Sequence, residues 1–433
     1  MDNFGIVLPM DKTFSPTHAK GTVTIPGSKS QTIRALLIAS LSGEQSTIIN
    51  ALDSHDTQSC MNLCTQIGAK ITWDANHTCL FCDASHVQNV QEAITLDCGN
   101  SGTTLYLATG MLASLPRKFT FSGDEQLQKR PIGPLLDALE TLGAKVERMN
   151  GIYPPFSIQG PLTGGACSIE CPTSQYLSGL LLACSLAKGD CEITVPLLYE
   201  KPYVSLTLQW LDEQNIRYEI SEDFQKARVY GNQHFKGFTT MVTGDFSSAS
   251  FFFCMAAIGK TSISVRGLNQ DDVQGDKKIL EILEAMGCKV VWEGKQVTVT
   301  GPEVLKGGTF DLNAMPDTLP ILSVTACFAE EDVSLVNVPQ ARIKETDRIA
   351  VMHEELEKIG AVIDEQVDGM TIRAGHPLTG GTVSGHDDHR VIMALAVASI
   401  AASGTINLLG VDAAAITFPT FFDLFDSITG DTI

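Results

Sequence analysis

The sequence predicts an α/β protein made of six similar units that are grouped into two domains. Three observations support this prediction: the chain has 433 residues, 44% of them are hydrophobic, and helical and strand-like segments alternate at a regular interval. A hydrophobic core stops growing beyond about 250–300 residues, so more than one domain is expected. The units, about 72 residues long, exceed the length of solenoid repeats. Two globular domains of three units each are therefore the more economical packing.

An amphipathic helix that ends at a small turn residue and leads into a strand recurs five times. Its apolar residues follow the i, i+3, i+4 spacing of a helix with one buried face. The turn residues lie 72 to 75 positions apart and are Gly68, Gly143, Asn215, Gly287 and Gly360. Glycine and asparagine adopt the left-handed conformation that closes a helix, so we expect helices to end at these positions.

A second and more apolar helix is expected in each unit. The six segments span residues 33–43, 104–115, 176–189, 249–260, 319–331 and 390–404, and each leads into a strand-like stretch such as CEITV or TSISVRG. Helices that are apolar on nearly all sides are buried. Each unit therefore contains one buried helix, one amphipathic helix and several short strands.

Charge and composition exclude some classes of partner. The chain carries 30 Lys and Arg against 50 Asp and Glu, for a formal charge of −20, whereas proteins that bind nucleic-acid backbones present basic faces. We expect no nucleic-acid partner. The first residues lack the pattern of a secretory signal, and no apolar run reaches the roughly 18 residues of a membrane span. We therefore expect a cytoplasmic protein that does not bind membranes.

The turns before the six buried helices are rich in residues that cap helix N-termini. These turns are residues 27–30, 99–104, 172–175, 244–248, 316–318 and 386–390. Capping alone explains any one of them. Six together suggest more, because a helix N-terminus offers free N–H groups and about half a positive charge. Several such ends would bind anions without a basic surface.

Basic residues in or beside these turns strengthen the prediction of an anion site. They are Lys29, Arg34, Lys129, Arg130, Lys201, Lys344, Arg348 and Arg390. Arginine matches the planar geometry of carboxylate and phosphate, so the set favours a ligand that carries both groups. Glu345 lies among mixed charges in KETDR and is a candidate catalytic carboxylate; a solvated charge run is the alternative.

Metal and nucleotide chemistry receive little support. His386 and His389 are three residues apart, but no third remote ligand is evident and Arg390 would repel a cation. The GNSG turn lacks the GK[ST] ending of a phosphate-binding loop, and no GxGxxG follows a strand. We expect neither a metal ion nor a nucleotide cofactor.

Ten motifs together resemble the family of 5-enolpyruvylshikimate-3-phosphate synthases. In order along residues 21–422 they are GSKSQTIRALLIASL, DCGNSGTT, KRPIGPLLDALETLGA, PTSQYLSGLL, EKPYVSLTL, TGDFSSASFF, MPDTLPILS, RIKETDRI, DDHRVIMALA and TFPTFF. The combination of GSKS, KETDR and DHR is specific, and the matches cover nearly the whole chain.

The resemblance implies the enolpyruvyl transferase fold. In that fold each of two domains contains three βαβαββ units, and the buried helices point their N-termini toward the interdomain cleft. By similarity, residues 1–26 and 243–433 form one discontinuous domain and residues 27–242 form the other. The active site is expected in the cleft between them.

The resemblance also implies a reaction that needs no metal or organic cofactor. The 5-hydroxyl of shikimate 3-phosphate adds to C2 of phosphoenolpyruvate through a tetrahedral intermediate, and phosphate is then eliminated, in the pathway to aromatic amino acids. Carried over by position, Asp317 is the base, Glu345 protonates the methylene carbon, and Lys29 is a cation and proton relay at the leaving phosphate. The protein is expected to be a monomer.

Binding residues carry over in the same way. Those that resemble the phosphoenolpyruvate site are Lys29, Gly102, Arg130, Gln175, Arg348 and Arg390. Those that resemble the shikimate 3-phosphate site are Lys29, Ser30, Arg34, Thr173, Ser174, Gln175, Tyr203, Asp317, Gln340 and Lys344.

Three positions depart from the family pattern. Tyr106 stands where many members have arginine, Ile416 where many have lysine, and Glu200 where serine is common. Glu200 puts a carboxylate near the expected phosphate of the acceptor. Two alternatives therefore stay open: an enolpyruvyl transferase that uses another cyclic alcohol, and an anion-binding protein without turnover.

Overall fold

The computed structural model describes residues 10–87 and 93–430, so most of the opening segment used to judge a secretory signal lies outside it. The chain divides into two compact domains, which are called unit 1 and unit 2 from here on and are distinct from the six repeats. Unit 1 comprises Met1–Ile25, Phe246–Gln270 and Lys278–Ile433, and unit 2 comprises Pro26–Asp245 and Asp271–Lys277. The segment 271–277 differs from the sequence-based division, which places it in the discontinuous domain. It joins unit 2 through contacts that no local pattern encodes, such as the hydrogen bond from Thr243 Oγ1 to Asp272 Oδ2 (2.8 Å).

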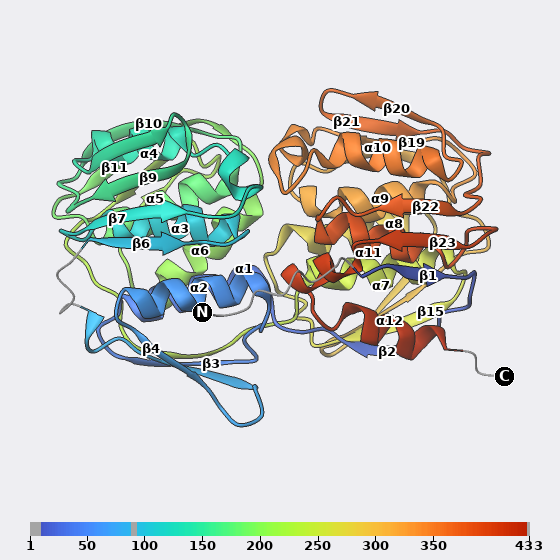
Figure 1. Cartoon of the computed structure of the whole chain (residues 1–433), viewed down its shortest axis with the longest axis horizontal. Coiled ribbons are helices and arrows are strands. Elements are labelled where there is room, and N and C mark those ends of the chain that lie inside the picture. Colours follow the sequence, from blue (N-terminus) through green and yellow to red (C-terminus); the bar gives the residue numbers. More distant parts are fainter. Residues whose placement is uncertain (1–9, 88–92, 431–433) are drawn as a thin grey trace. The chain divides into compact units, whose positions relative to one another are not determined.

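Unit 2 contains three four-stranded sheets and six helices among its described residues (Figure 1). Its helices are α1 (Lys29–Ser40), α2 (His55–Gln66), α3 (Gly102–Leu112), α4 (Gly133–Thr141), α5 (Ser174–Ser185) and α6 (Lys201–Glu213). Its strands are β3 (Gln45–Ile49), β4 (Lys70–Trp73), β5 (Cys79–Asp83), β6 (Ile94–Asp97), β7 (Lys118–Ser122), β8 (Lys145–Asn150), β9 (Tyr153–Gln159), β10 (Gly165–Cys171), β11 (Cys191–Leu198), β12 (Tyr218–Ile220), β13 (Lys226–Val229) and β14 (Thr239–Met241).

Unit 1 has two four-stranded sheets and one three-stranded sheet in its described part. Its helices are α7 (Phe246–Ile258), α8 (Ile279–Ala285), α9 (Leu319–Ala326), α10 (Arg348–Lys358), α11 (His389–Ala398) and α12 (Phe421–Thr429). Its strands are β1 (Lys12–Phe14), β2 (Gly21–Thr24), β15 (Ser262–Arg266), β16 (Lys289–Glu293), β17 (Gln296–Thr300), β18 (Gly308–Asp311), β19 (Val333–Val336), β20 (Ile363–Gln366), β21 (Gly369–Ile372), β22 (Gly381–Ser384) and β23 (Ile406–Leu409).

The predicted repeat is confirmed, with one exception. In five sheets two parallel strands are followed by an antiparallel hairpin, as in the order β6-β7-β9-β8. The sixth sheet keeps only the parallel pair β22 and β23, and β1 from the start of the chain pairs antiparallel with β23. Two of the five four-stranded sheets take an edge strand from a distant part of the chain, since β2 pairs with β15 and β14 pairs with β3.

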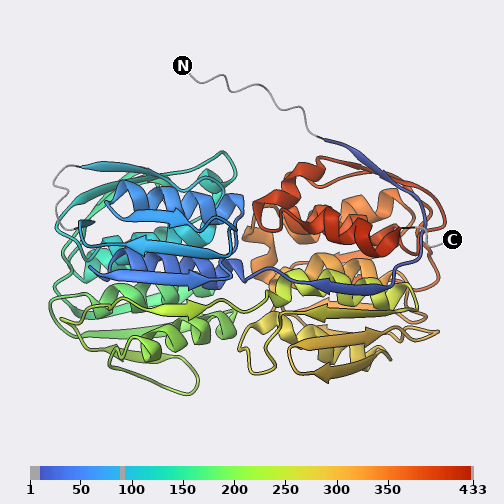
Figure 2. The same cartoon turned by 90° about the horizontal axis from the view of Figure 1, so that it is seen from below.

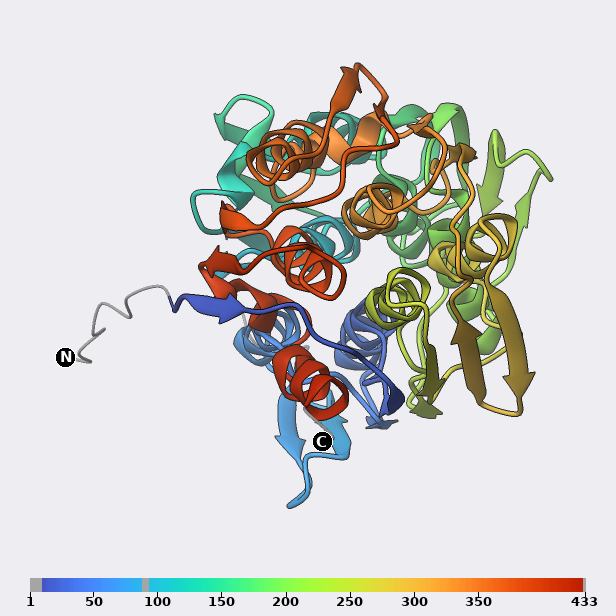
Figure 3. The ribbon, with the colours of Figure 1, turned by 90° about the vertical axis from the view of Figure 1, so that its right-hand side faces the viewer.

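Buried helices form the centre of each unit, as predicted. In unit 2, α3 packs against α1 and α5, and in unit 1, α7, α9 and α11 pack against one another. Figure 3 views the helices of unit 1 nearly end on, with its sheets toward the outside. Every residue of α7 is buried, and one apolar cluster fills each unit. These helices are apolar on all sides because other helices or a sheet cover every face.

The amphipathic helices α2, α4, α6, α8 and α10 end as predicted. The φ angles of Gly68, Gly143, Asn215, Gly287 and Gly360 are 110°, 108°, 55°, 103° and 106°, in the left-handed region. Each of these residues is followed, after one or two intervening residues, by the expected strand. Figure 2 shows the strands of both units along their outer faces. Among the described residues, no helix combines the length and apolar character that a membrane crossing requires.

Candidate active site

Arg348 is the centre of a buried charge cluster in unit 1. It is the first residue of α10, and its side chain is 1% exposed. Its guanidinium donates to Asp388 Oδ2 at 2.8 Å, to Asp317 Oδ1 at 2.7 Å and to Glu345 Oε2 at 2.5 Å. The predicted base and the predicted proton donor therefore bind the same cation.

The charges of this cluster shift one another's pKa values. Burial alone would raise the pKa of Asp317, but attraction by Arg390, Lys344 and Arg348 outweighs it and holds this pKa well below the usual range. Burial would lower the pKa of Arg348, but Asp388, Glu345 and Asp317 hold it above its ordinary value. Asp317 is consequently ionised at neutral pH, as a proton acceptor must be.

The first turn of α11 adds a second cation and a buried cap. Arg390 binds Asp317 Oδ2 at 3.0 Å and donates to the hydroxyl of Ser247 near the start of α7. Asp388 caps α11 by accepting from the Arg390 backbone N–H at 2.9 Å, and it is fully buried. The sequence does not reveal Asp388 as a partner of Arg348, because an aspartate at this position is explained by capping alone.

Two other predicted residues of unit 1 belong to the short helix η5 (Pro339–Ile343) and its end. Gln340 is buried and donates through Nε2 to the Asn313 carbonyl at 3.0 Å, whereas its Oε1 has no partner within the described part of the chain. Lys344 follows η5 directly and lowers the pKa of Asp317 by its charge. Lys344 therefore acts on the Arg348 cluster through its charge, and Gln340 lies four residues before Lys344 in the sequence.

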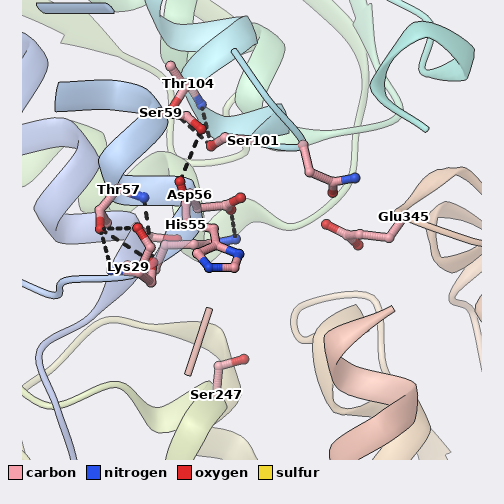
Figure 4. A network of polar contacts seen from close by, with 12 residues as sticks. Lys29, His55, Asp56, Thr57, Ser59, Ser101, Thr104, Ser247 and Glu345 are labelled. Atoms are coloured by element: carbon pink, nitrogen blue, oxygen red, sulfur yellow. Dashed lines mark hydrogen bonds and ion pairs between the residues drawn. The ribbon is translucent and has the colours of Figure 1, made fainter. Parts of the chain in front are cut away.

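Lys29 begins α1 in unit 2 and pairs with a carboxylate that the sequence analysis did not single out. Its Nζ lies 3.0 Å from Asp56 Oδ2 in the first turn of α2. Figure 4 shows this pair together with Ser101 and Thr104, whose hydroxyls are 2.8 Å apart at the start of α3. The signal for Asp56 is the sequence SHDT, in which Ser54 and Thr57 form a capping box that fixes this turn.

Arg130 lies against Gly102, and the lack of a side chain at residue 102 leaves room for the guanidinium. A Cβ atom at residue 102 would come within 2.6 Å of Arg130 Nη1. Arg130 donates through Nη2 to Asn100 Oδ1 at 2.9 Å, and Asn100 donates in turn to Asp124 at 2.7 Å. Asn100 thus helps to orient Arg130, which is predicted to bind phosphoenolpyruvate. The signal for Asn100 in the sequence is the GNSG turn.

The start of α5 holds three predicted ligands of the acceptor. Thr173 caps the helix through its hydroxyl, which accepts from the Gln175 N–H at 3.4 Å. Ser174 and Thr173 both donate to the carboxylate of Glu200. The side-chain oxygen Oε1 of Gln175 is buried and has no partner among residues 10–87 and 93–430.

Arg34, Ser30 and Tyr203 link α1 to α6. Arg34 is 1% exposed and donates to Thr207 Oγ1 and the Ser30 carbonyl, both at 3.0 Å, and to the Tyr203 carbonyl at 3.1 Å. Burial lowers the pKa of Arg34 to about 10. The hydroxyl of Tyr203 donates to Asp276 in the segment 271–277. These bonds hold the starts of α1 and α6 together beside Lys29.

The two histidines of HDDHR do not bind a common partner. His386 Nε2 lies 2.6 Å from Glu355 Oε1, while His389 is fully buried and neither of its ring nitrogens has a partner in the described residues. Glu354, Glu355 and His386 are the one group of side chains, within the described residues, close enough together to hold a metal ion. Lys358 Nζ already binds both glutamates, at 2.9 and 2.7 Å.

Comparison with known proteins identifies the family. The family model of EPSP synthase (3-phosphoshikimate 1-carboxyvinyltransferase) matches residues 15–425. The chain belongs to the EPSP synthase family. A 3-phosphoshikimate 1-carboxyvinyltransferase of Acetivibrio thermocellus is 42% identical over 417 residues, covering 96% of this chain and 97% of the relative. One of Chlamydia caviae is 38% identical, covering 96% and 92%.

Solved structures agree with this family. EPSP synthase from Acinetobacter baumannii superposes with a TM-score of 0.81 at 26% identity, covering 97% of this chain and 98% of that one. The enolpyruvyl transferase NikO from Streptomyces tendae has a TM-score of 0.79 at 16% identity, covering 98% of both chains, and shares the fold. The predicted fold and family are confirmed. The chain is an enolpyruvyl transferase of the shikimate pathway, which leads to aromatic amino acids, and the relatives favour neither alternative interpretation.

Proposed function

We propose that the Arg348 cluster performs the acid–base steps of enolpyruvyl transfer to shikimate 3-phosphate. Asp317 accepts the proton of the 5-hydroxyl as the hydroxyl oxygen bonds to C2 of phosphoenolpyruvate. Glu345, which takes up a proton when the carboxylate of phosphoenolpyruvate shares Arg348, donates that proton to C3. In the second step the C2–O bond to phosphate breaks and a proton leaves C3, and Glu345, now ionised, is able to take it. The observation that carries the proposal is that one buried guanidinium binds both carboxylates.

Substrate binding would tune these carboxylates. Arg348 and Arg390 both pair with Asp317, and this attraction makes Asp317 a weak base. When the carboxylate of phosphoenolpyruvate shares these arginines, their attraction for Asp317 is partly neutralised and the pKa of Asp317 rises. The base would thus become stronger only when its substrate is present.

The remaining predicted residues are assigned by what their side chains supply. We assign Arg348, Arg390, Lys29 and Arg130 to the charges of phosphoenolpyruvate and the leaving phosphate, and Gly102 to the space beside Arg130. We assign the acceptor to Lys29, Ser30, Arg34, Thr173, Ser174, Gln175 and Tyr203 together with Asp317, Gln340 and Lys344. The unpartnered oxygens of Gln175 and Gln340 support this assignment, since buried polar atoms require partners. The cytoplasmic location and the monomeric state stay predictions.

One assay tests the proposed function. Phosphate release from phosphoenolpyruvate is measured with and without shikimate 3-phosphate, and again with unphosphorylated shikimate. We expect release that depends on shikimate 3-phosphate. Release only with another acceptor, or none with any acceptor despite anion binding, would contradict the proposal. Asp317→Asn should abolish most of the release, while Asp311→Asn, at an exposed aspartate of β18 in the same unit, should leave it unchanged.

A further inference from the structure

Glu200 has its carboxylate at the start of a helix that is not its own. It directly precedes α6 and is 2% exposed, yet its side chain makes no capping bond to α6. Instead, Oε2 accepts three hydrogen bonds at the start of α5. The donors are the Ser174 N–H at 3.1 Å, the Ser174 hydroxyl at 2.8 Å and the Thr173 hydroxyl at 3.2 Å.

The fold brings these residues together and keeps them there. Strands β10 and β11 are parallel neighbours, so the turns that follow them, at Thr173 and at Glu200, emerge at the same edge of the sheet. Glu200 has a left-handed backbone, with φ of 57° and ψ of 38°. A residue other than glycine rarely adopts this conformation. The side-chain contacts to α5 are therefore part of what holds the turn in place.

The donors that Glu200 uses are two of the residues assigned above to the phosphorylated acceptor. A helix N-terminus that offers two hydroxyls and a backbone N–H outside the helical hydrogen bonds is suited to bind an anion. The carboxylate of Glu200 is the anion that these donors bind here. A phosphate group cannot take the same three donors while the carboxylate keeps them, and the two negative charges would repel at such short range.

We infer that Glu200 is a specificity-determining residue whose carboxylate occupies the phosphate-binding donors of Thr173 and Ser174, so that a phosphorylated acceptor has to displace it. This inference rests on the proposed function, in particular on the assignment of Thr173 and Ser174 to the acceptor. Glu200 keeps buried donors satisfied before the acceptor binds, and it weakens the binding of every anion at this position.

The test compares Glu200→Ser with the unaltered enzyme. The substitution removes the carboxylate and leaves a small hydroxyl. We expect the KM for shikimate 3-phosphate, and its Kd measured by calorimetry without phosphoenolpyruvate, to fall about tenfold. The kcat and the KM for phosphoenolpyruvate should stay within twofold. The preference for shikimate 3-phosphate over shikimate, as a ratio of kcat/KM values, should rise about tenfold. Inorganic phosphate, as a competitor of shikimate 3-phosphate, should also inhibit about tenfold more strongly.

Glu213→Ser is the matched control. Glu213 is the last residue of α6 and is exposed, so its replacement removes the same charge from the same helix far from α5. It should leave the KM and Kd for shikimate 3-phosphate unchanged. If it lowers them as much as Glu200→Ser does, a general charge effect explains the result and the inference is wrong.

Other outcomes also decide the matter. An unchanged or higher Kd for shikimate 3-phosphate in a folded Glu200→Ser enzyme would overturn the inference, and Glu200 would then be a capping residue of α5 only. If Glu200→Ser does not fold, Glu200→Gln keeps the shape and removes the charge, and its Kd should still fall. If the unaltered enzyme releases no phosphate with shikimate 3-phosphate, the proposed function fails, whereas the binding measurements still test Glu200.

Discussion

At the scale of single residues, Arg348 positions the candidate acid and the candidate base by forming ion pairs with both. It is a buried cation with three carboxylate partners, Asp388, Asp317 and Glu345. Asp388 is fully buried and caps α11, so its bond to Arg348 serves to fix the guanidinium. Asp317 and Glu345 are more exposed, at 20% and 9% of their side chains. The two carboxylates that the proposed reaction needs thus bind a buried cation that Asp388 also holds.

We expect Glu345→Gln to lower kcat by about 10²- to 10⁴-fold, the usual contribution of a positioned acid or base. The amide can still accept a hydrogen bond from Arg348, so the KM values should stay within about threefold. Steady-state kinetics with both substrates measures this split. Glu357→Gln, at an exposed glutamate of α10, should not change kcat. A variant with normal kcat and a raised KM would assign Glu345 to binding.

Gly102→Ala should weaken the binding of phosphoenolpyruvate. The new Cβ would meet Arg130 Nη1 at 2.6 Å, and because this atom ends a flexible side chain, Arg130 would move away. We expect the KM for phosphoenolpyruvate to rise about tenfold, the loss typical of one charged hydrogen bond.

The Kd for shikimate 3-phosphate serves as an internal control for Gly102→Ala and should change less than twofold. A second control is Gly430→Ala, where the nearest atom to the new Cβ would be 3.6 Å away. An unchanged KM for phosphoenolpyruvate in the Gly102→Ala enzyme would show that Arg130 does not contact this substrate.

Candidate site residues were predicted from the sequence, whereas several of the side chains that contact them were not. Arg348 and Arg130 were predicted from their types and their places near helix starts. Asp388, Asn100 and Asp56 were not, although they bind Arg348, Arg130 and Lys29. A polar residue at a helix start is explained by local capping. Which distant cation it also contacts depends on tertiary packing that has no signal in local spacing.

At the scale of elements, helix ends were the most predictable feature. The five residues that close the amphipathic helices all have left-handed backbones. The rule is local, since only glycine and asparagine adopt this conformation at little cost. Helix starts are equally local, and α2 shows it: Ser54 and Thr57 each accept a bond from the other's backbone, at 3.5 and 2.8 Å.

Ser54→Ala should therefore destabilise the protein by about 1 kcal/mol, the usual value of an N-cap. The midpoint of thermal unfolding, followed by circular dichroism, should fall by a few degrees. Ser59→Ala is the control in the same helix, because its hydroxyl only donates back to the His55 carbonyl at 3.0 Å. This control should be neutral or slightly stabilising, since alanine favours helix. Equal losses in both variants would contradict the capping argument.

At the scale of the whole molecule, the number of repeats was predictable but the strand exchange was not. The interval of 72 to 75 residues between helix ends predicts the repeats. It does not predict that β1 completes the sheet of β22 and β23, or that β2 and β14 each complete a sheet whose other strands are far away in sequence. Such pairings are selected by hydrogen bonding and packing over the full chain. Short strands of three or four residues carry too little pattern to reveal them.

The pH dependence of overall stability should depend on His389. Burial lowers its pKa to about 3, whereas an unfolded histidine has a pKa of about 6.5. Between these values the unfolded chain binds a proton that the folded protein excludes. His389 therefore contributes no acid sensitivity above pH 6.5, and stability falls as the pH decreases from 6.5 toward 3. From pH 7 to pH 5 the loss should be about 2 kcal/mol.

Comparison of variants isolates this effect from other groups. The pKa of His353 is raised, against the effect of burial, by Glu365 and Glu357, so His353 acts in the opposite direction. The lowered pKa values of Asp317 and Asp388 matter only below about pH 4.

Urea unfolding at pH 7 and pH 5 should give a smaller loss of stability for His389→Gln than for the unaltered protein, by about 2 kcal/mol. His376→Gln, at an exposed histidine in the same unit, should behave like the unaltered protein. If His389→Gln loses as much stability between pH 7 and pH 5 as the unaltered protein does, the native state accepts a proton at His389 near pH 6. Burial would then not keep this ring neutral.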